Sequence, residues 1–217
     1  MKDPLQEKVL EVYRRLVQIY GEPERGRLDP VSELVSTILS QNTNDLNRDR
    51  AYNSLRGRFP TWEAMLGAPV DQIEKAIRVA GLWREKAPRI QESLRRITRE
   101  RGELSLAFLA EMPVPKAKAW LRRLPGVGPK TAAIILLFSL GKPAFPVDTH
   151  VHRVATRLGL VPKVSAEKAH DLLEARIPPE TYLAYHINLI RHGRAVCRPK
   201  PLCSACGLRD VCEYIVE

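Results

Sequence analysis

The sequence predicts an all-α protein built from many short helices. Apolar residues recur at intervals of three and four along much of the chain, which is the spacing of one helix face. Capping residues stand where these patterns begin, as at Asp29-Pro30, where an aspartate precedes a proline that suits the first helical turn. The alternation of apolar and polar residues that indicates strands is nearly absent.

These patterns divide the chain into helical segments. In the first half we expect helices over 4–20, from Pro30 to the segment SQNTND, from Asn44 or Asp45 to Arg58, after Thr61, over 70–79 and over 83–101. Shorter helical pieces follow at 106–111 and 116–123, and a helix begins near Pro129. Three more helices are expected at the end of the chain, capped by Asp148 or Thr149, capped by Ser165, and starting near Glu180. With no internal repeat or long linker, we expect any second domain to consist of helices packed closely on the first.

The composition favours an anionic partner. The chain has 35 basic and 25 acidic residues, a formal charge of +10 and a pI near 9.7, which is typical of nucleic-acid-binding proteins but also fits a generic basic surface. Only 6% of the residues are aromatic, which argues against a protein that binds single strands by stacking. No apolar run approaches the length of a membrane span, and the charged N-terminus is unlike a signal peptide. We therefore expect a cytoplasmic protein with no membrane partner.

The segment LPGVGPKTA contains a turn with two glycines followed by a helix start. Gly126 and Gly128 permit backbone conformations and close approaches that other residues do not, and Pro129 suits the first turn of a helix. Free amide groups at such a turn form a natural phosphate site. By itself the pattern is equally compatible with a structural helix-turn-helix corner.

The longer string resembles the helix-hairpin-helix DNA glycosylase superfamily, because a Gly/Pro-rich loop, LGKPAFPVDTH, follows and places Asp148 eighteen residues after Lys130. The presence of both GVGPKTA and VDTH is most similar to the endonuclease III branch. The resemblance implies a six-helix barrel domain over 27–143 and a four-helix iron–sulfur cluster domain formed by 1–26 and 144–217. It also implies a monomer in the bacterial or archaeal nucleoid that binds double-stranded DNA containing a damaged base or an abasic site in the cleft between these domains.

Lys130 and Asp148 are the predicted catalytic residues. A lysine amine is nucleophilic only after it loses its proton, which burial and a helix N-terminus both favour. Attack by Lys130 on C1′ of a nucleotide would expel the base and give a Schiff base, from which β-elimination breaks the strand. Asp148 would stabilise positive charge on the sugar, although its position is equally that of a helix N-cap. The resemblance implies a bifunctional glycosylase and apurinic/apyrimidinic lyase, with oxidised pyrimidines as the expected lesions.

Two further segments correspond to loops that the family inserts into DNA. Enzymes that act on a base take it out of the stack, and inserted side chains fill the gap. By resemblance, Gln41 and Leu82 are the inserted residues. The run QNTND differs from the sequence that is commoner in the family at this position, and Trp83 directly follows Leu82. The preferred lesion is therefore left open. As an alternative, the polar run is a helix junction with capping residues.

All four cysteines lie in a C-x5-C-x2-C-x5-C array: Cys197, Cys203, Cys206 and Cys212. Four thiolates are suitable ligands for a zinc ion or for a four-iron cluster, and the spacing does not distinguish them. The resemblance implies a [4Fe-4S] cluster with a structural role, although the family usually has six residues between the first two cysteines. Arg198 and Lys200 lie in this loop and are candidates for phosphate contacts or for solvated charges.

Three classes of function remain: a bifunctional glycosylase and lyase, a non-catalytic helix-hairpin-helix DNA-binding protein, and an iron–sulfur electron carrier. The presence of both Lys130 and Asp148 favours the first, because neither of the others requires this pair. Within enzymes, a monofunctional adenine or mismatch glycosylase is the nearest alternative.

Overall fold

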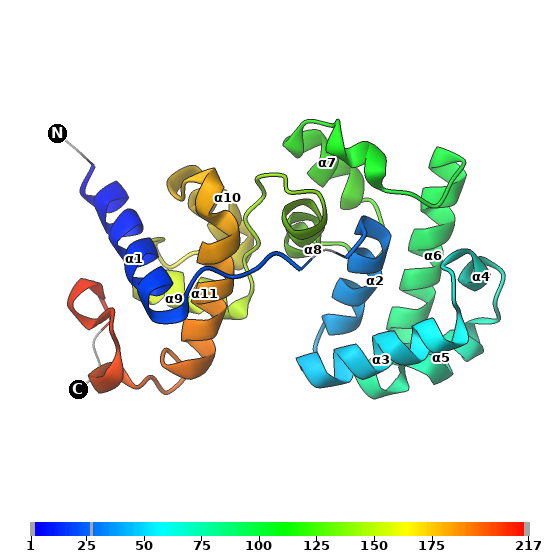
Figure 1. The fold of residues 1–217 in the computed structure, drawn as a ribbon, viewed down its shortest axis with the longest axis horizontal. Coiled ribbons are helices and arrows are strands. Elements are labelled where there is room, and N and C mark those ends of the chain that lie inside the picture. Colours follow the sequence, from blue (N-terminus) through cyan, green and yellow to red (C-terminus); the bar gives the residue numbers. More distant parts are fainter. Residues whose placement is uncertain (1–2, 27, 215–217) are drawn as a thin grey trace. The chain divides into compact units, whose positions relative to one another are not determined.

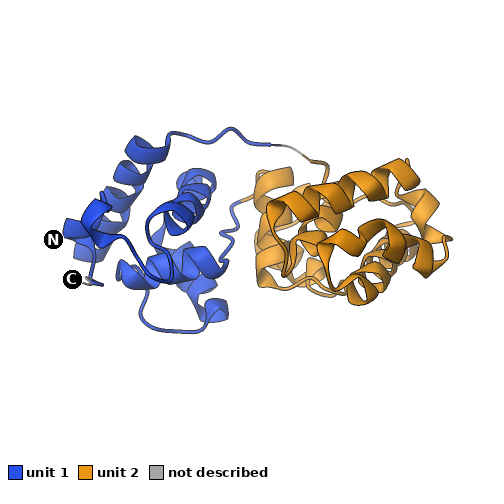
Figure 2. Cartoon of the chain, turned by 90° about the horizontal axis from the view of Figure 1, so that it is seen from below, with its two compact units in different colours: residues 1–26, 143–217 blue, residues 27–142 orange. Residues whose placement is uncertain are grey.

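The computed structural model describes residues 3–26 and 28–214 and divides the chain into two compact units (Figures 1 and 2). Unit 1 combines residues 1–26 with 143–217, and unit 2 comprises residues 27–142. Helices are the regular secondary structure throughout the described ranges, which contain no strand, so the predicted all-α class is confirmed. No helix in these ranges is long and apolar enough to cross a membrane.

Unit 2 is a bundle in which α2 and α6 supply much of the core. Its elements are α2 (Pro30–Ser40), α3 (Asp45–Arg58), α4 (Glu63–Leu66), α5 (Val70–Ile77), η1 (Arg78–Ala80), α6 (Trp83–Arg101), η2 (Ala107–Ala110), α7 (Val114–Leu121), α8 (Pro129–Ile134) and η3 (Ile135–Ser139). Helix α2 packs against α3, α6 and α8. Leu34 and Ile38 of α2 and Ile90 and Leu94 of α6 are completely buried, which removes their apolar surface from water and stabilises the unit.

Unit 1 is arranged around α11, which packs against α1 and α9. Its elements are α1 (Pro4–Tyr20), α9 (Thr149–Arg157), α10 (Ala166–Arg176), η4 (Pro179–Thr181), α11 (Tyr182–Ala195), η5 (Cys203–Ala205) and η6 (Arg209–Val211). Tyr185 of α11 is fully buried, its ring stacks on Tyr13 of α1, and its hydroxyl donates to the carbonyl of Val9. Helix α1 and helix α11, which are far apart in the sequence, are therefore held in one core.

Several helix starts are fixed by the predicted capping residues. Asp29 Oδ1 accepts hydrogen bonds from the backbone N–H groups of Val31 and Ser32, both at 3.0 Å. Asn44 and Ser165 cap α3 and α10 in the same manner. Because these caps satisfy amide groups that the helix itself leaves unpaired, the predicted positions of these starts are confirmed.

The helix after Gly128 departs from regular α geometry. It is α-helical from Pro129 to Ile134 and then becomes a π-helix over Ile135–Ser139. Ile135, Leu136 and Leu137 are buried, so the wider turn directs three consecutive apolar side chains into the core. The sequence pattern predicts a helix here but not this change of helical type.

Candidate functional site

The hairpin between α7 and α8 contains two glycines with different backbone requirements. Gly126 has φ +78°, a left-handed conformation that favours glycine, and an added Cβ would lie 3.3 Å from Cδ of Arg89. Gly128 has φ −92°, is exposed, and is the N-cap of α8 without a side-chain capping bond. A Cβ added to Gly128 would meet open space. The fold therefore requires a glycine at 126, whereas the bare backbone at 128 lies open to solvent.

Lys130 lies in the first turn of α8, directly after Pro129. Its side chain is partly exposed, and within the described part of unit 2 its ammonium group takes part in no ion pair. The sequence of the hairpin explains the placement, because Gly128 and Pro129 start the helix one residue before the lysine. Lys130 thus carries a partly exposed side chain close to the exposed backbone of Gly128.

Asp148 is the N-cap of α9 in unit 1. Its Oδ1 accepts a hydrogen bond of 2.7 Å from the backbone N–H of Val151. Two buried histidines hold the extended residues that precede it: His170 Nδ1 lies 3.0 Å from the carbonyl oxygen of Phe145, and His186 Nδ1 lies 2.9 Å from that of Pro146. The structural alternative for Asp148, a helix cap, is therefore present, and the carboxylate is held at a fixed position.

The two predicted DNA-inserting loops belong to unit 2 and share a backbone feature. Gln41 ends α2, and its Nε2 donates to the carbonyl oxygen of Gly126 at 2.8 Å, so the structure brings this loop against the hairpin. Leu82 precedes α6 with φ 49°, and its side chain is 44% exposed. Among the described residues, Asn42 (φ 51°) and Leu82 are the two non-glycine residues with positive φ. Such strained backbone is typical of functional loops.

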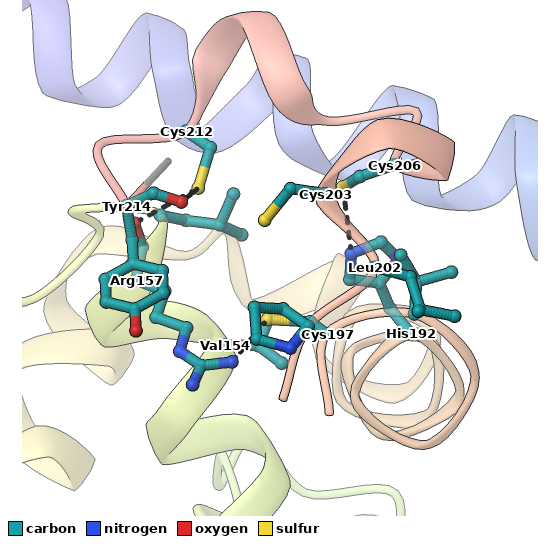
Figure 3. Close-up of a pocket in the computed structure, with 12 residues that line it drawn as sticks. Val154, Arg157, His192, Cys197, Leu202, Cys203, Cys206, Cys212 and Tyr214 are labelled. Atoms are coloured by element: carbon teal, nitrogen blue, oxygen red, sulfur yellow. Dashed lines mark hydrogen bonds between the residues drawn. The ribbon is translucent and has the colours of Figure 1, made fainter. Parts of the chain in front are cut away.

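The four cysteines line one cavity in unit 1 and are all free thiols (Figure 3). The thiol sulfurs have polar neighbours: Nη1 of Arg157 lies 3.4 Å from Sγ of Cys197 and Nε2 of His192 lies 3.5 Å from Sγ of Cys206. Burial raises the pKa of both Cys206 and Cys212. Across residues 3–26 and 28–214, no three His, Cys, Asp or Glu side chains converge as they would around a single metal ion.

His192 connects the cysteine cavity to α1. Its ring is buried, with Nδ1 3.1 Å from the hydroxyl oxygen of Tyr20 and Nε2 facing Cys206. Burial lowers the pKa of His192 to about 4, so the ring is neutral at ordinary pH. When Tyr20 donates to Nδ1, the proton of the ring is on Nε2 and is directed at the sulfur of Cys206.

Arg198 and Lys200 are both exposed on the cysteine loop. Nε of Arg198 donates to the carbonyls of Arg194 and Ala195 in the last turn of α11, at 3.2 and 3.1 Å. Its guanidinium thus stabilises the C-terminal end of that helix.

Three residues with a structural part in these sites were not found from sequence: Lys86, Arg157 and His192. Lys86 is buried on α6, and its Nζ bonds the carbonyls of Leu39 and Ala80, each at 2.8 Å. The sequence did contain a sign that Lys86 is buried, because it lies on the same helix face as the apolar residues Ile90 and Leu94. For Arg157 and His192, the partners in the cysteine loop lie far along the chain, and local patterns do not reveal them.

Comparison with known proteins defines the class. A family model described as HhH-GPD superfamily base excision DNA repair protein matches residues 35–179, a range that includes the hairpin, Lys130 and Asp148. The chain belongs to this superfamily of base excision DNA repair proteins.

Individual relatives narrow the assignment. The chain is 33% identical to endonuclease III of Thermotoga maritima over 211 residues, which cover 97% of this chain and 92% of the relative. It is 41% identical to a longer relative from Arabidopsis thaliana over 174 residues, which represent 80% of this chain and 57% of that relative. A solved structure of a trapped endonuclease III–DNA covalent intermediate matches with a TM-score of 0.81 and 28% identity, covering 98% of this chain and 97% of the other. The protein is an endonuclease III-like DNA glycosylase of base excision repair, and the resemblance seen in its sequence is confirmed.

Proposed function

We propose that this protein is a bifunctional DNA N-glycosylase and apurinic/apyrimidinic lyase that removes oxidised pyrimidines of the thymine glycol type from duplex DNA. The observation that carries the proposal is the position of Lys130, whose partly exposed side chain lies in the first turn of α8, two residues after the exposed backbone of Gly128. The trapped covalent complex reported for an endonuclease III supports a covalent mechanism in a structural relative.

In the proposed reaction, the nitrogen of Lys130 bonds to C1′ of the damaged nucleotide while the N-glycosidic bond breaks and the base leaves with the bonding electrons. The nitrogen then loses a proton and its lone pair displaces O4′ from C1′, so that O4′ takes up a proton and a Schiff base forms between the lysine nitrogen and C1′. Removal of a proton from C2′ then expels the 3′ phosphate by β-elimination and breaks the strand. Gly126 and Gly128 contribute by allowing a DNA phosphate to approach the start of α8 closely.

Asp148 is proposed to act on the same nucleotide as Lys130. Its negative charge stabilises the positive charge that develops on the sugar as the base leaves, and it assists proton transfer. The N-cap bond to Val151 and the anchored residues before it support this role, because they fix the carboxylate before DNA binds.

Gln41 and Leu82 are proposed to enter the duplex and fill the space of the extruded nucleotide. Leu82 is 44% exposed and has a strained backbone at a helix start, which supports insertion of its apolar side chain into the stacked bases. Arg198 and Lys200 are proposed to contact phosphates, where cations add affinity without reading sequence.

The cysteines Cys197, Cys203, Cys206 and Cys212 are proposed to hold a [4Fe-4S] cluster that shapes the C-terminal loop. They fit such a group, because four thiols surround one cavity next to a guanidinium and a neutral imidazole that complement thiolate charge. Four thiols are also suitable ligands for a zinc ion, so metal content distinguishes the two groups. A brown protein that contains iron without stoichiometric zinc is the expected result, and a colourless zinc protein isolated without oxygen would contradict it.

The two units are proposed to correspond to a six-helix barrel domain, residues 27–143, and a cluster domain, residues 1–26 and 144–217. We expect the protein to act as a monomer on nucleoid DNA.

Borohydride trapping tests the lyase proposal. The wild-type protein should form a covalent adduct with a thymine glycol duplex, and Lys130→Gln should abolish it. Lys75→Gln, the same change at an exposed lysine of α5, should retain the adduct. An intact adduct in Lys130→Gln would show that another group is the nucleophile. Base removal by the wild type without any adduct would instead indicate a monofunctional glycosylase.

A lesion panel tests the substrate proposal. Duplexes that carry thymine glycol, uracil, an abasic site or 8-oxoguanine opposite each base are assayed with and without alkali, which separates base removal from strand cleavage. We expect thymine glycol to be processed fastest among the base lesions. A stronger preference for adenine opposite 8-oxoguanine would contradict the proposed specificity.

A further inference from the structure

Lys86 is a buried cation that connects two loops. Its side chain is 1% exposed within unit 2, and Nζ donates to the carbonyl oxygens of Leu39 and Ala80, both at 2.8 Å. Leu39 is the penultimate residue of α2, and Ala80 is the last residue of η1. The chain leaves these two ends directly into the loops that contain Gln41 and Leu82.

The two acceptors explain why a lysine is tolerated at this position. Carbonyl groups in the last turn of a helix lack partners within the helix, and they carry the negative end of its dipole. A buried ammonium is costly unless hydrogen bonds compensate for the water it has lost. Lys86 satisfies two such carbonyls, one from α2 and one from η1, and so joins the ends of these two segments directly.

The loops that Lys86 joins also contain the strained backbone of this unit. Asn42 has φ 51° and Leu82 has φ 49°, and each conformation costs a non-glycine residue on the order of 1 kcal/mol. Such conformations persist only where the surrounding structure holds them in place. The bonds from Lys86 are made one residue before Ser40-Gln41 and one residue before Gly81-Leu82, where they hold the start of each loop.

We propose that Lys86 is a positioning residue that fixes the Gln41 loop and the Leu82 loop relative to each other, so that both side chains enter damaged duplex DNA together. The inference rests on the proposed insertion of Gln41 and Leu82. Lys86 does not touch DNA in this arrangement, because its side chain is 1% exposed, and it acts through the residues that do.

The same helix offers a matched control. Gln91 of α6 is 4% exposed, and its Nε2 donates to the carbonyls of Met65 and Ala68 at 2.8 and 2.7 Å. It therefore bridges two carbonyls as Lys86 does, but one lies in α4 and the other in the turn between α4 and α5. Lys86→Met and Gln91→Met each remove two buried hydrogen bonds and retain an apolar side chain of similar length.

The experiment measures insertion without catalysis. The DNA probe is a duplex with a tetrahydrofuran abasic analogue opposite 2-aminopurine, whose fluorescence reports displacement of that base from the stack. Both methionine variants should lose thermal stability, but Lys86→Met alone should lose the fluorescence change and bind the probe about tenfold more weakly than wild type, relative to undamaged duplex. In a Gln41→Ala/Leu82→Ala background, Lys86→Met should have no further effect on the ratio of affinities.

The outcomes separate the two proposals. If Leu82→Ala weakens the fluorescence change but Lys86→Met behaves like Gln91→Met, Lys86 is a structural residue only and the inference is overturned. The inference is also overturned if Lys86→Met lowers the ratio of affinities equally in the wild-type and Gln41→Ala/Leu82→Ala backgrounds. If neither Gln41→Ala nor Leu82→Ala affects the wild-type signal, the insertion proposal itself fails and the role of Lys86 fails with it.

Discussion

The side-chain amide of Gln41 donates a 2.8 Å hydrogen bond to the carbonyl oxygen of Gly126, joining the end of α2 to the turn of the hairpin. A neutral hydrogen bond of this kind contributes about 1 kcal/mol, so DNA contacts are able to replace it if the side chain enters the duplex as proposed. The bond therefore holds Gln41 beside the hairpin without preventing its movement.

The two hairpin glycines should respond differently to alanine. Gly126→Ala places a side chain at φ +78° and against Arg89, so we expect a loss of stability of about 1–2 kcal/mol. Gly128→Ala places a Cβ in open space at an ordinary φ, so its stability should stay close to wild type while DNA affinity falls. Urea unfolding and fluorescence anisotropy with a lesion duplex measure the two effects. Unchanged affinity in Gly128→Ala would remove Gly128 from the DNA surface.

The helices and their caps were predictable because they depend on residues close in sequence. Asp29 and Asn44 satisfy amide groups two or three residues away, so the pattern alone indicates where α2 and α3 begin. Lys86 shows why other features were missed: one of its acceptors, Leu39, is 47 residues distant. The positive φ of Leu82 likewise depends on how η1 meets α6, which no local pattern specifies.

In the candidate site too, features that depend on neighbouring residues were predictable and features that depend on distant residues were not. The hairpin and Asp148 are recognisable in sequence because glycine, proline and capping residues have defined local geometry. The surroundings of the cysteines are not, since Arg157 and His192 reach the loop from α9 and α11. Roles that act through another residue therefore emerge only from the fold.

His192 should influence how firmly the proposed cluster is held. In His192→Leu, the hydroxyl of Tyr20 and the sulfur of Cys206 both lose their buried partner. Loss of such outer ligand contacts typically weakens metal binding by about 10–100-fold, so visible absorbance should disappear faster when an iron chelator is added.

His170→Leu is the matched control for this experiment. His170 is also buried in unit 1, but its Nδ1 faces the carbonyl of Phe145 rather than a cysteine. Equal rates of absorbance loss in the two variants would indicate that His192 acts only through general stability.

Lys86 should make stability depend on pH. Burial lowers its pKa from 10.5 to about 8, so between these values the unfolded chain binds more protons than the folded protein. Stability relative to Lys86→Met should therefore rise as the pH increases from about 8 toward 10.5, by up to about 3 kcal/mol, and stay flat below about pH 7. The difference in the free energy of unfolding between wild type and Gln91→Met should not vary with pH in this way, because glutamine does not titrate. Urea unfolding across this pH range measures the stability difference between wild type and Lys86→Met. If wild type becomes less stable relative to Lys86→Met as the pH rises, the pKa of Lys86 is not lowered by burial.

Asp148 allows its capping role to be separated from its proposed catalytic role. Asparagine is as good an N-cap as aspartate, so Asp148→Asn should keep the bond to Val151 and the stability of α9. The Asp148→Asn variant lacks the negative charge of the carboxylate, so the rate of base excision should fall by at least about 100-fold. Asp148→Ala loses both functions and should also be destabilised by about 1 kcal/mol. Single-turnover assays on a thymine glycol duplex, read beside thermal unfolding, measure both effects. If Asp148→Asn excises the base at the wild-type rate, the carboxylate is a helix cap and the charge on the sugar must be stabilised by another group.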